Sequence, residues 1–311
     1  MQAGFRDDCR MKVLNTGFLL AGALVFQQAA PPTPLIRENA TVKVSEHVYV
    51  IPDGNVGGVP NVGIIVGSKA TLVVETGLGP RNGQTVLREV SKVSSNADLY
   101  IVGTHFHSEH ILGESAFPAS AKVLRARAQQ QDIEEFGVQP NFATRSPAMA
   151  ELMKDASFRR ADEIFDTEKI VDLGGVRVRL LWYGGTHTNG DTFIFVEGDN
   201  VLFAGDVIMN RRFVAFNARS SLRAWLRSLD EAARLHPTRI VPSHGEMGDG
   251  SLIEIDRNYL QSLQTRVGEL KREGKTLEQA VESATTEFRG KYPDWTGNAG
   301  AAARAAYNEA N

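Results

Sequence analysis

Cysteine is nearly absent from this sequence of 311 residues, with Cys9 as its single example. The rest of the chain has no thiol, which excludes disulfide bonds and thiolate metal ligands there and is compatible with an oxidising compartment. A strong charge excess is also missing, because 34 basic and 37 acidic residues leave a formal net charge of −3. Basic residues form only short runs, such as Arg159-Arg160, so we expect no nucleic-acid partner.

Long hydrophobic runs are missing too. The most apolar stretch near the amino terminus, residues 17–26, is too short for a comfortable membrane span, so no stable membrane anchor is expected. It follows a lysine and precedes Ala30 and two prolines, a layout typical of a secretory signal peptide. We therefore expect a leader and signal peptide over residues 1–30, a linker over 31–41, and a periplasmic or secreted mature protein. An uncleaved tail is the alternative.

The remaining chain alternates β-rich and helical segments. With 42% hydrophobic residues, it can bury the core of one large α/β domain. Two β-rich halves, each followed by helices, predict two packed sheets with helices outside. Strands are expected over residues 42–51, 62–75, 99–102, 169–173, 176–182, 192–197, 201–203 and 239–242, and helices over 82–95, 125–136, 147–164, 220–235, 252–273 and 277–288. We expect residues 125–165 to form a helical insertion and the alanine-rich residues 296–311 to be a loosely held tail.

A dense group of histidines follows the predicted strand at residues 99–102. The sequence from residue 105 to residue 110 is HFHSEH. In extended backbone, residues two apart face the same way, so His105 and His107 can converge on one ion. Glu109 and His110 begin the next turn and face a neighbouring position. Imidazole and carboxylate groups are ligands of zinc, iron and manganese, so this segment predicts a metal site.

Three later residues occupy similar places in the sequence. His187, Asp206 and His244 each lie where a predicted strand gives way to a loop, which is where a rigid sheet can present ligands to an open cleft. The two remaining histidines, His47 within a strand pattern and His236 at a helix end, are interpreted as structural. The sequence therefore predicts a site assembled from distant segments.

The order and spacing of these residues resembles the metallo-β-lactamase superfamily, whose pattern is His-x-His-x-Asp-His, a lone histidine, a bridging Asp or Cys, and a final histidine. The resemblance covers roughly residues 42–263. It implies a four-layer αββα sandwich of two mixed sheets in a domain over residues 42–295, with a dinuclear site at the edge between the sheets. It also implies that two zinc ions are bound, the first by His105, His107 and His187 and the second by Glu109, His110 and His244, with Asp206 bridging them.

The sequence departs from the family pattern at two carboxylates. Glu109 stands where the family usually has aspartate, and Glu75 stands where an aspartate commonly precedes Thr-Gly. By the resemblance, Glu75 orients a ligating histidine, a role with leverage on metal affinity. Each change adds one methylene, so the second site could bind an ion as in the family, bind it weakly, stay empty, or select another ion such as iron or manganese.

The resemblance implies a hydrolase that acts on a small molecule. A metal-bridged hydroxide would attack the substrate, with Glu109 and Asp206 steering the proton. Aspartate rather than cysteine at position 206 favours an ester, thioester or lactone as substrate. Export keeps β-lactam hydrolysis open as an alternative, and a metal-binding scaffold without turnover is the alternative from another class.

Two further segments are candidate substrate contacts. The glycine-rich loop over residues 53–61 is expected to be a flexible hairpin that covers substrate, with an ordinary hairpin turn as the alternative. Asn210 and Arg211, just after the bridging aspartate, could bind an anionic substrate or an oxyanion, or could be plain surface. The sequence indicates no particular oligomeric state.

Overall fold

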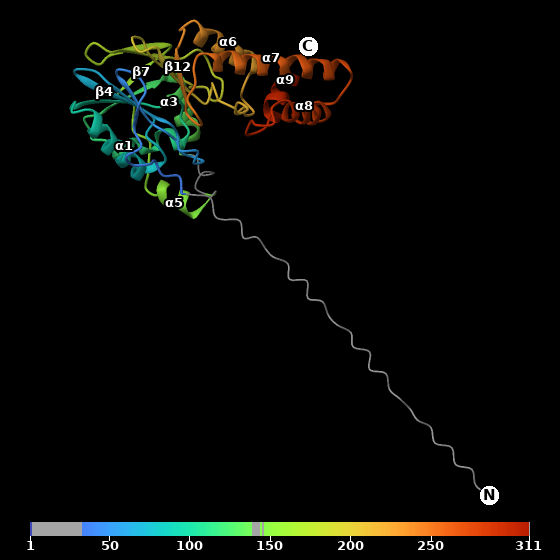
Figure 1. Ribbon diagram of the computed structural model, residues 1–311, viewed down its shortest axis with the longest axis horizontal. Helices are drawn as coiled ribbons and strands as arrows, with labels where there is room; N and C mark the ends of the chain where they lie inside the picture. Colours follow the sequence, from blue (N-terminus) through green and yellow to red (C-terminus); the bar gives the residue numbers. More distant parts are fainter. Residues whose placement is uncertain (2–32, 139–143, 145, 311) are drawn as a thin grey trace. The chain divides into compact units, whose positions relative to one another are not determined.

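The computed structural model describes Met1, residues 33–138, Thr144 and residues 146–310 (Figure 1). The predicted signal peptide lies outside the described residues, apart from Met1. Contacts divide the chain into Met1–Pro31 and Pro32–Asn311, and every element below belongs to the second unit.

The first sheet has seven strands, which lie in sequence order. They are β1 (Val42–Lys43), β2 (Val48–Ile51), β3 (Val62–Val66), β4 (Ala70–Val74), β5 (Asp98–Val102), β6 (Lys122–Ala126) and β7 (Glu163–Phe165). Strands β1 to β4 pair antiparallel, and β4 to β7 pair parallel. Because parallel strands end at the same edge, the loop after β5 opens at the edge where β4 also ends.

The second sheet has five strands in the order β12-β11-β10-β9-β8. They are β8 (Glu168–Asp172), β9 (Arg177–Leu181), β10 (Phe193–Val196), β11 (Val201–Gly205) and β12 (Arg239–Pro242). All pairs are antiparallel except β11 with β12. The β8–β9 turn uses Gly174 and Gly175, both with positive φ, and Asp172 accepts both of their N–H groups.

Alternation along the strands explains the layers. In β4, Leu72 joins a core cluster with Phe203 of the second sheet, while its neighbour Val73 joins a cluster with Val86 of α1 (Gly79–Val93). In β11, Phe203 faces the first sheet, whereas its neighbour Leu202 joins the cluster that contains residues of the helices α6 (Leu222–Ala233) and α7 (Ser251–Arg272). The predicted αββα sandwich is therefore confirmed.

The segment expected as a helical insertion also supplies strands to the first sheet. It holds α3 (Arg127–Phe136) and α5 (Pro147–Met153), but it begins in β6 and ends with β7. The prediction of helix over residues 147–164 is thus wrong beyond Met153. The β-rich segments expected over 42–51 and 62–75 each contain two strands.

The carboxy-terminal residues are packed rather than loosely held. Helix α9 (Gly300–Glu309) buries Ala302, Ala303 and Ala306 in the cluster that holds residues of α7 and α8 (Leu277–Lys291). Small side chains let these helix backbones approach closely, so alanine favours packing here. No helix in the described part of the chain combines the length and apolarity that a membrane span needs.

Candidate metal centre

The histidine motif follows β5 at the sheet edge. After a short loop, α2 (Ser108–Ile111) begins with His107 as its N-cap residue and is followed by the 3-10 helix η1 (Leu112–Ala116). His105 and His110 are fully buried, and Glu109 is 7% exposed. The motif therefore changes from extended to helical between His107 and Ser108, which separates its side chains into two groups.

The loop that carries His187 is shaped by a buried aspartate. Asp191 accepts hydrogen bonds from the backbone N–H groups of Thr186 (3.1 Å) and Thr188 (2.8 Å) and from both threonine hydroxyls. At Gly190 the loop touches α3 so closely that a Cβ would lie 2.2 Å from Cα of Gln129. Burial raises the pKa of Asp191, against the hydrogen bonds that favour its charged form.

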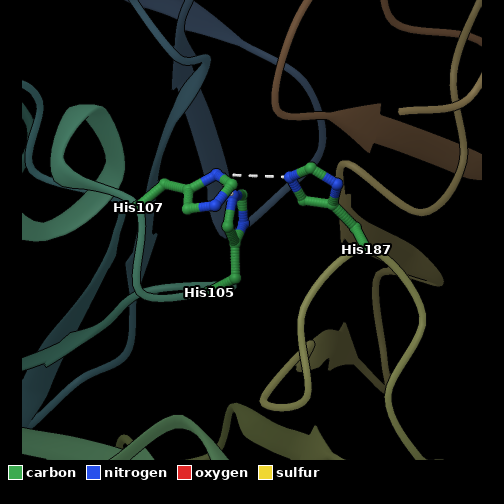
Figure 2. A group of neighbouring side chains, drawn as sticks. All are labelled: His105, His107 and His187. Carbon is green, nitrogen blue, oxygen red and sulfur yellow. Dashed lines mark hydrogen bonds between the residues drawn. The ribbon is translucent and has the colours of Figure 1, made fainter. Parts of the chain in front are cut away.

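Three imidazole nitrogens converge beside this loop. Figure 2 shows the rings of His105, His107 and His187 facing one another, with His187 reaching in from the other side. Nδ1 of His107 lies 3.1 Å from Nε2 of His105 and 3.2 Å from Nε2 of His187. Zinc–nitrogen bonds of about 2.0–2.1 Å at tetrahedral angles separate two ligand atoms by roughly 3.3 Å, close to this spacing. The group has the geometry of three ligands of one ion.

A second group lies next to the first. One ligand atom each from Glu109, His110 and His244 lies within 4.8 Å of the others, and the same holds for His105, His110 and Asp206. Asp206 faces both groups, since its Oδ2 is 3.7 Å from Nε2 of His187 and its Oδ1 is 3.9 Å from Nε2 of His244. The structure thus brings all seven predicted ligands together, with Asp206 between the two groups.

Backbone carbonyls fix which ring nitrogen faces the site. Nδ1 of His187 donates to the carbonyl of Ala215, and Nδ1 of His244 donates to the carbonyl of Val59 at 2.9 Å. A carbonyl only accepts, so each Nδ1 carries the proton and each Nε2 keeps a lone pair for an ion.

Several buried atoms at the centre have no hydrogen-bond partner. They are Oε2 of Glu109, Nε2 of His110 and Oδ1 of Asp206. Burying such atoms unpaired costs free energy, and native structures satisfy nearly all of them. Since these atoms converge with the other donors, a bound cation satisfies them, and the donor set fits zinc or another divalent metal.

Burial and neighbouring side chains shift several pKa values in the cluster, keeping His105 neutral and Asp206 charged but requiring His110 to release a proton when a cation binds. Burial, together with the neighbouring histidines, lowers the pKa of His105 well below its usual value, which keeps the ring neutral for ligation. Burial disfavours charge on Asp206, but His244 and the other histidines outweigh it and lower its pKa, so it stays a carboxylate. Burial raises the pKa of Glu109. Burial lowers the pKa of His110 less than Glu75 raises it, and the result is about 9.

Glu75 lies behind the site and positions it. It is 1% exposed, with a positive φ of 67°, and its Oε1 accepts from the hydroxyls of Thr104 (2.6 Å) and Ser243 (3.1 Å). The same oxygen lies 3.3 Å from Nδ1 of His110. Sequence reasoning expected Glu75 in this role but missed Thr104 and Ser243. A signal was present, because each hydroxyl residue directly precedes a candidate ligand, His105 or His244.

We predict that Glu75→Gln weakens metal affinity by about 10–100-fold, because His110 loses the carboxylate that orients its ring. Glu89→Gln is the matched control, since Glu89 is also buried and also accepts from a threonine, Thr41, but lies on α1 away from the site. Competition with a chromogenic chelator measures the affinity. An equal loss in both variants, or none in Glu75→Gln, contradicts the assigned role.

The glycine-rich loop over residues 53–61 supports His244 and is tied down at its base. Oδ2 of Asp53 accepts from the N–H of Gly245 at 2.7 Å. Nδ2 of Asn61 donates to the carbonyls of Pro242 and Gly245, each at 2.8 Å. The base of this loop is therefore held by hydrogen bonds, while the flexibility of its tip and its role as a substrate cover stay predictions.

The other residues singled out are not among the groups of candidate metal ligands. The side chain of Asn210 donates to the carbonyl of Glu246, and Arg211 is exposed with a φ of 52°. Their contact with substrate stays a prediction. His47 pairs with Asp199 at 2.8 Å, and His236 is exposed at the end of a helix, as expected of structural histidines.

A cavity of about 320 Å³ opens beside the first histidine group. Its lining consists of Phe106, His107, Asp132, Phe136, Gly185, Thr186, His187, Thr188, Asn189, Asn217, Ala218 and Arg219. Two of the candidate ligands, His107 and His187, form part of its wall, so a molecule in the cavity touches the metal centre.

Solved structures share this fold. A metallo-beta-lactamase from Pontibacter korlensis aligns with a TM-score of 0.58 at 19% identity, over 71% of this chain and 98% of its own. The DIM-1 metallo-beta-lactamase aligns with a TM-score of 0.57 at 17% identity, over 73% and 98%. The inverting sec-alkylsulfatase Pisa1 from Pseudomonas sp. aligns with a TM-score of 0.67 at 15% identity, over 86% of this chain and 50% of its own. Identities this low show a shared fold alone.

The sequence itself identifies the family. The family model of the metallo-beta-lactamase superfamily matches residues 55–244, which is more than half of the chain and contains all seven candidate ligands. The resemblance inferred from the histidine pattern is thereby confirmed. The chain belongs to the metallo-beta-lactamase superfamily.

Proposed function

We propose that this protein is a metal-dependent hydrolase that uses two divalent ions, zinc by preference, to cleave a small ester, thioester or lactone. The observation that carries the proposal is the convergence of seven donor side chains in which buried atoms of Glu109, His110 and Asp206 have no partner within the protein. Members of this superfamily are mostly hydrolases, which supports turnover rather than a scaffold role.

The positions of the candidate ligands assign them to two ions. His105, His107 and His187 would hold one ion, and Glu109, His110 and His244 the other, with an oxygen of Asp206 toward each group. When bound, such an ion pair activates water at neutral pH and polarises the bond under attack. No cysteine lies among residues 33–310, so the chain offers no thiol nucleophile there.

Glu109 is the candidate proton acceptor. Its Oε1 lies 3.8 Å from Nε2 of His110, while its buried Oε2 has no partner. Burial raises its pKa, which brings the carboxyl closer to the range useful for general base catalysis. We propose that one oxygen of Glu109 would face the ion, while the other takes the proton of the attacking water and later delivers it to the leaving group.

Two alternative reactions can be tested in the same experiment. Proteins named as metallo-beta-lactamases and an alkylsulfatase share the fold, so β-lactam and sulfate-ester hydrolysis are both tested. Aspartate at the bridging position, where many β-lactamases of the family carry cysteine, favours the ester, thioester or lactone.

A substrate panel tests the proposal. Purified protein, its metal content measured by mass spectrometry, is assayed with an aryl ester, a thioester, a lactone, a β-lactam, a sulfate ester and a phosphate diester. We expect hydrolysis of an acyl substrate that falls at least ~1000-fold after chelation and returns with zinc. Turnover of only the β-lactam or the sulfate ester would replace the proposed substrate class. No turnover of any member by fully loaded protein would favour the scaffold.

A further inference from the structure

Part of the wall of the cavity beside the metal centre is formed by aromatic rings. Phe106 lies between two candidate ligands in the sequence and stacks on Phe136, with ring centroids 5.4 Å apart and planes inclined by 28°. Phe136, the last residue of α3, is 40% exposed. Figure 2 shows the rings of His107 and His187, which both belong to the lining of the same cavity.

The polar side chains of the lining are already engaged with the protein. Both oxygens of Asp132 accept hydrogen bonds, from Nδ2 of Asn189 at 2.8 Å and from the N–H of Gly190 at 3.0 Å. Asn217 donates to the carbonyl of His187, and the hydroxyl of Thr188 donates to Asp191. A ligand therefore meets few free hydrogen-bonding groups on these walls, in contrast to the aromatic faces.

The one cation of the lining is neutralised. Arg219 forms two hydrogen bonds to Glu135, at 2.6 and 3.1 Å, and its guanidinium lies 4.6 Å from the ring centroid of Phe136. Glu135 and Phe136 are the last residues of α3, and Arg219 lies in the loop before α6. The contact of Arg219 with both residues therefore joins α3 to this loop. Arg219 thus braces the aromatic wall, and the charge of its guanidinium is balanced by the carboxylate of Glu135.

We infer that this cavity binds an apolar aryl or branched alkyl group of the substrate, attached next to the carbonyl that is hydrolysed. The inference rests on the proposed function for the position of the carbonyl, since His107 and His187 belong both to the cavity wall and to the metal centre. A volume of about 320 Å³ is at the lower end of the range for ligand sites and is large enough for a ring-sized group.

Binding of two small carboxylates, phenylacetate and acetate, tests the inference without turnover. They share the group that can bind a metal and differ by the ring, so the ratio of their dissociation constants reports on the cavity. We expect phenylacetate to bind the zinc-loaded protein at least about tenfold more tightly than acetate, measured by calorimetry or by NMR titration. Equal affinity for the two probes would overturn the inference.

Two variants locate the effect. Phe136→Ala removes the exposed aromatic wall, and Ala218→Trp fills the cavity from a lining position, so each should reduce the tenfold preference to about twofold or less. Ile255→Ala, which removes an exposed apolar side chain of α7 outside the cavity, is the matched control and should keep the preference. An unchanged preference in both cavity variants would place the ring elsewhere and refute the inference.

Catalysis separates this inference from the proposed function. With p-nitrophenyl phenylacetate and p-nitrophenyl acetate, we expect kcat/KM to favour the aryl substrate by about tenfold in the native protein and to lose that preference in Phe136→Ala. Hydrolysis of both esters with no preference refutes the cavity assignment but supports the hydrolase. Ring binding that responds to the variants, with no hydrolysis, supports an apolar site and refutes the proposed reaction.

Discussion

Replacing Asp206 with asparagine is expected to lower kcat/KM for the best substrate of the panel by at least ~1000-fold. Asp206 is 7% exposed, and its two oxygens lie 3.7 and 3.9 Å from Nε2 of His187 and of His244. The amide keeps the shape but removes the negative charge that both groups of donors share. Metal content should fall from two ions per chain to one or none.

The matched control is Asp98→Asn, which makes the same chemical change at an exposed aspartate at the start of β5. It should leave both metal content and kcat/KM within about twofold of the native protein, as expected of a surface substitution. If Asp206→Asn retained two ions and most of its activity, the bridging role would be excluded. Loss of activity with full metal content would instead assign Asp206 to proton transfer.

The second large effect concerns stability. Arg125 and Glu114 form an ion pair in which both side chains are 1% exposed, and Nη1 of Arg125 also donates to the carbonyl of Arg159 at 2.5 Å. Arg125→Met leaves Glu114 buried without a cation, so the free energy of unfolding should fall by about 3–5 kcal/mol. Urea unfolding followed by circular dichroism measures this loss.

The pH dependence of that variant has a definite sign. Burial already raises the pKa of Glu114, opposed chiefly by Arg125, so removing the arginine raises this pKa further. A carboxyl whose folded-state pKa exceeds its unfolded value of about 4.3 destabilises the fold as pH rises through that window. Arg125→Met should therefore lose more stability at neutral pH than at about pH 5.

Two further variants isolate the buried charge. Adding Glu114→Gln to Arg125→Met removes the uncompensated carboxylate and should recover part of the lost stability and most of the pH dependence. Arg177→Met breaks an exposed pair with Glu197 and should cost less than about 1 kcal/mol. A similar loss of unfolding free energy in Arg125→Met and Arg177→Met would contradict the expectation that breaking the buried pair is more destabilising than breaking the exposed one.

The metal centre was predictable from sequence because its signals are local. The candidate ligands lie in the segments that follow the apolar strands β5, β9, β11 and β12, and a strand end fixes where the following segment lies at the sheet edge. Thus His187 and His244 could be assigned to one site although 57 positions separate them in the numbering. The role of Glu75, which directly follows β4, was instead implied by the resemblance to the family.

The region between the two halves was read wrongly for a physical reason. Strand β7 has three residues and an exposed Ile164, so it shows no alternation that distinguishes it from a helix. Strand β6 contains Arg125, a charged residue that reads as exposed but is buried by its pairing with Glu114. Both are tertiary effects that overrule the local pattern.

The apolar cavity could not be predicted at all. Phe106, Phe136 and Arg219 lie far apart in the sequence, and none has a motif of its own. Only the packing of α3 against the loop before α6 brings them together. The same holds for Ala302 of α9, whose small side chain indicates a weak helix contact until its neighbours are known.

The position of His244 sets the order of events during synthesis under the proposed function. It follows β12, an edge strand of the second sheet that pairs in parallel with β11. No nascent chain that stops before His244 holds every donor, so full loading with metal waits until this last strand has docked. Occupancy of both ions would then report that the two sheets have assembled, before or after α7, α8 and α9 pack on the second sheet.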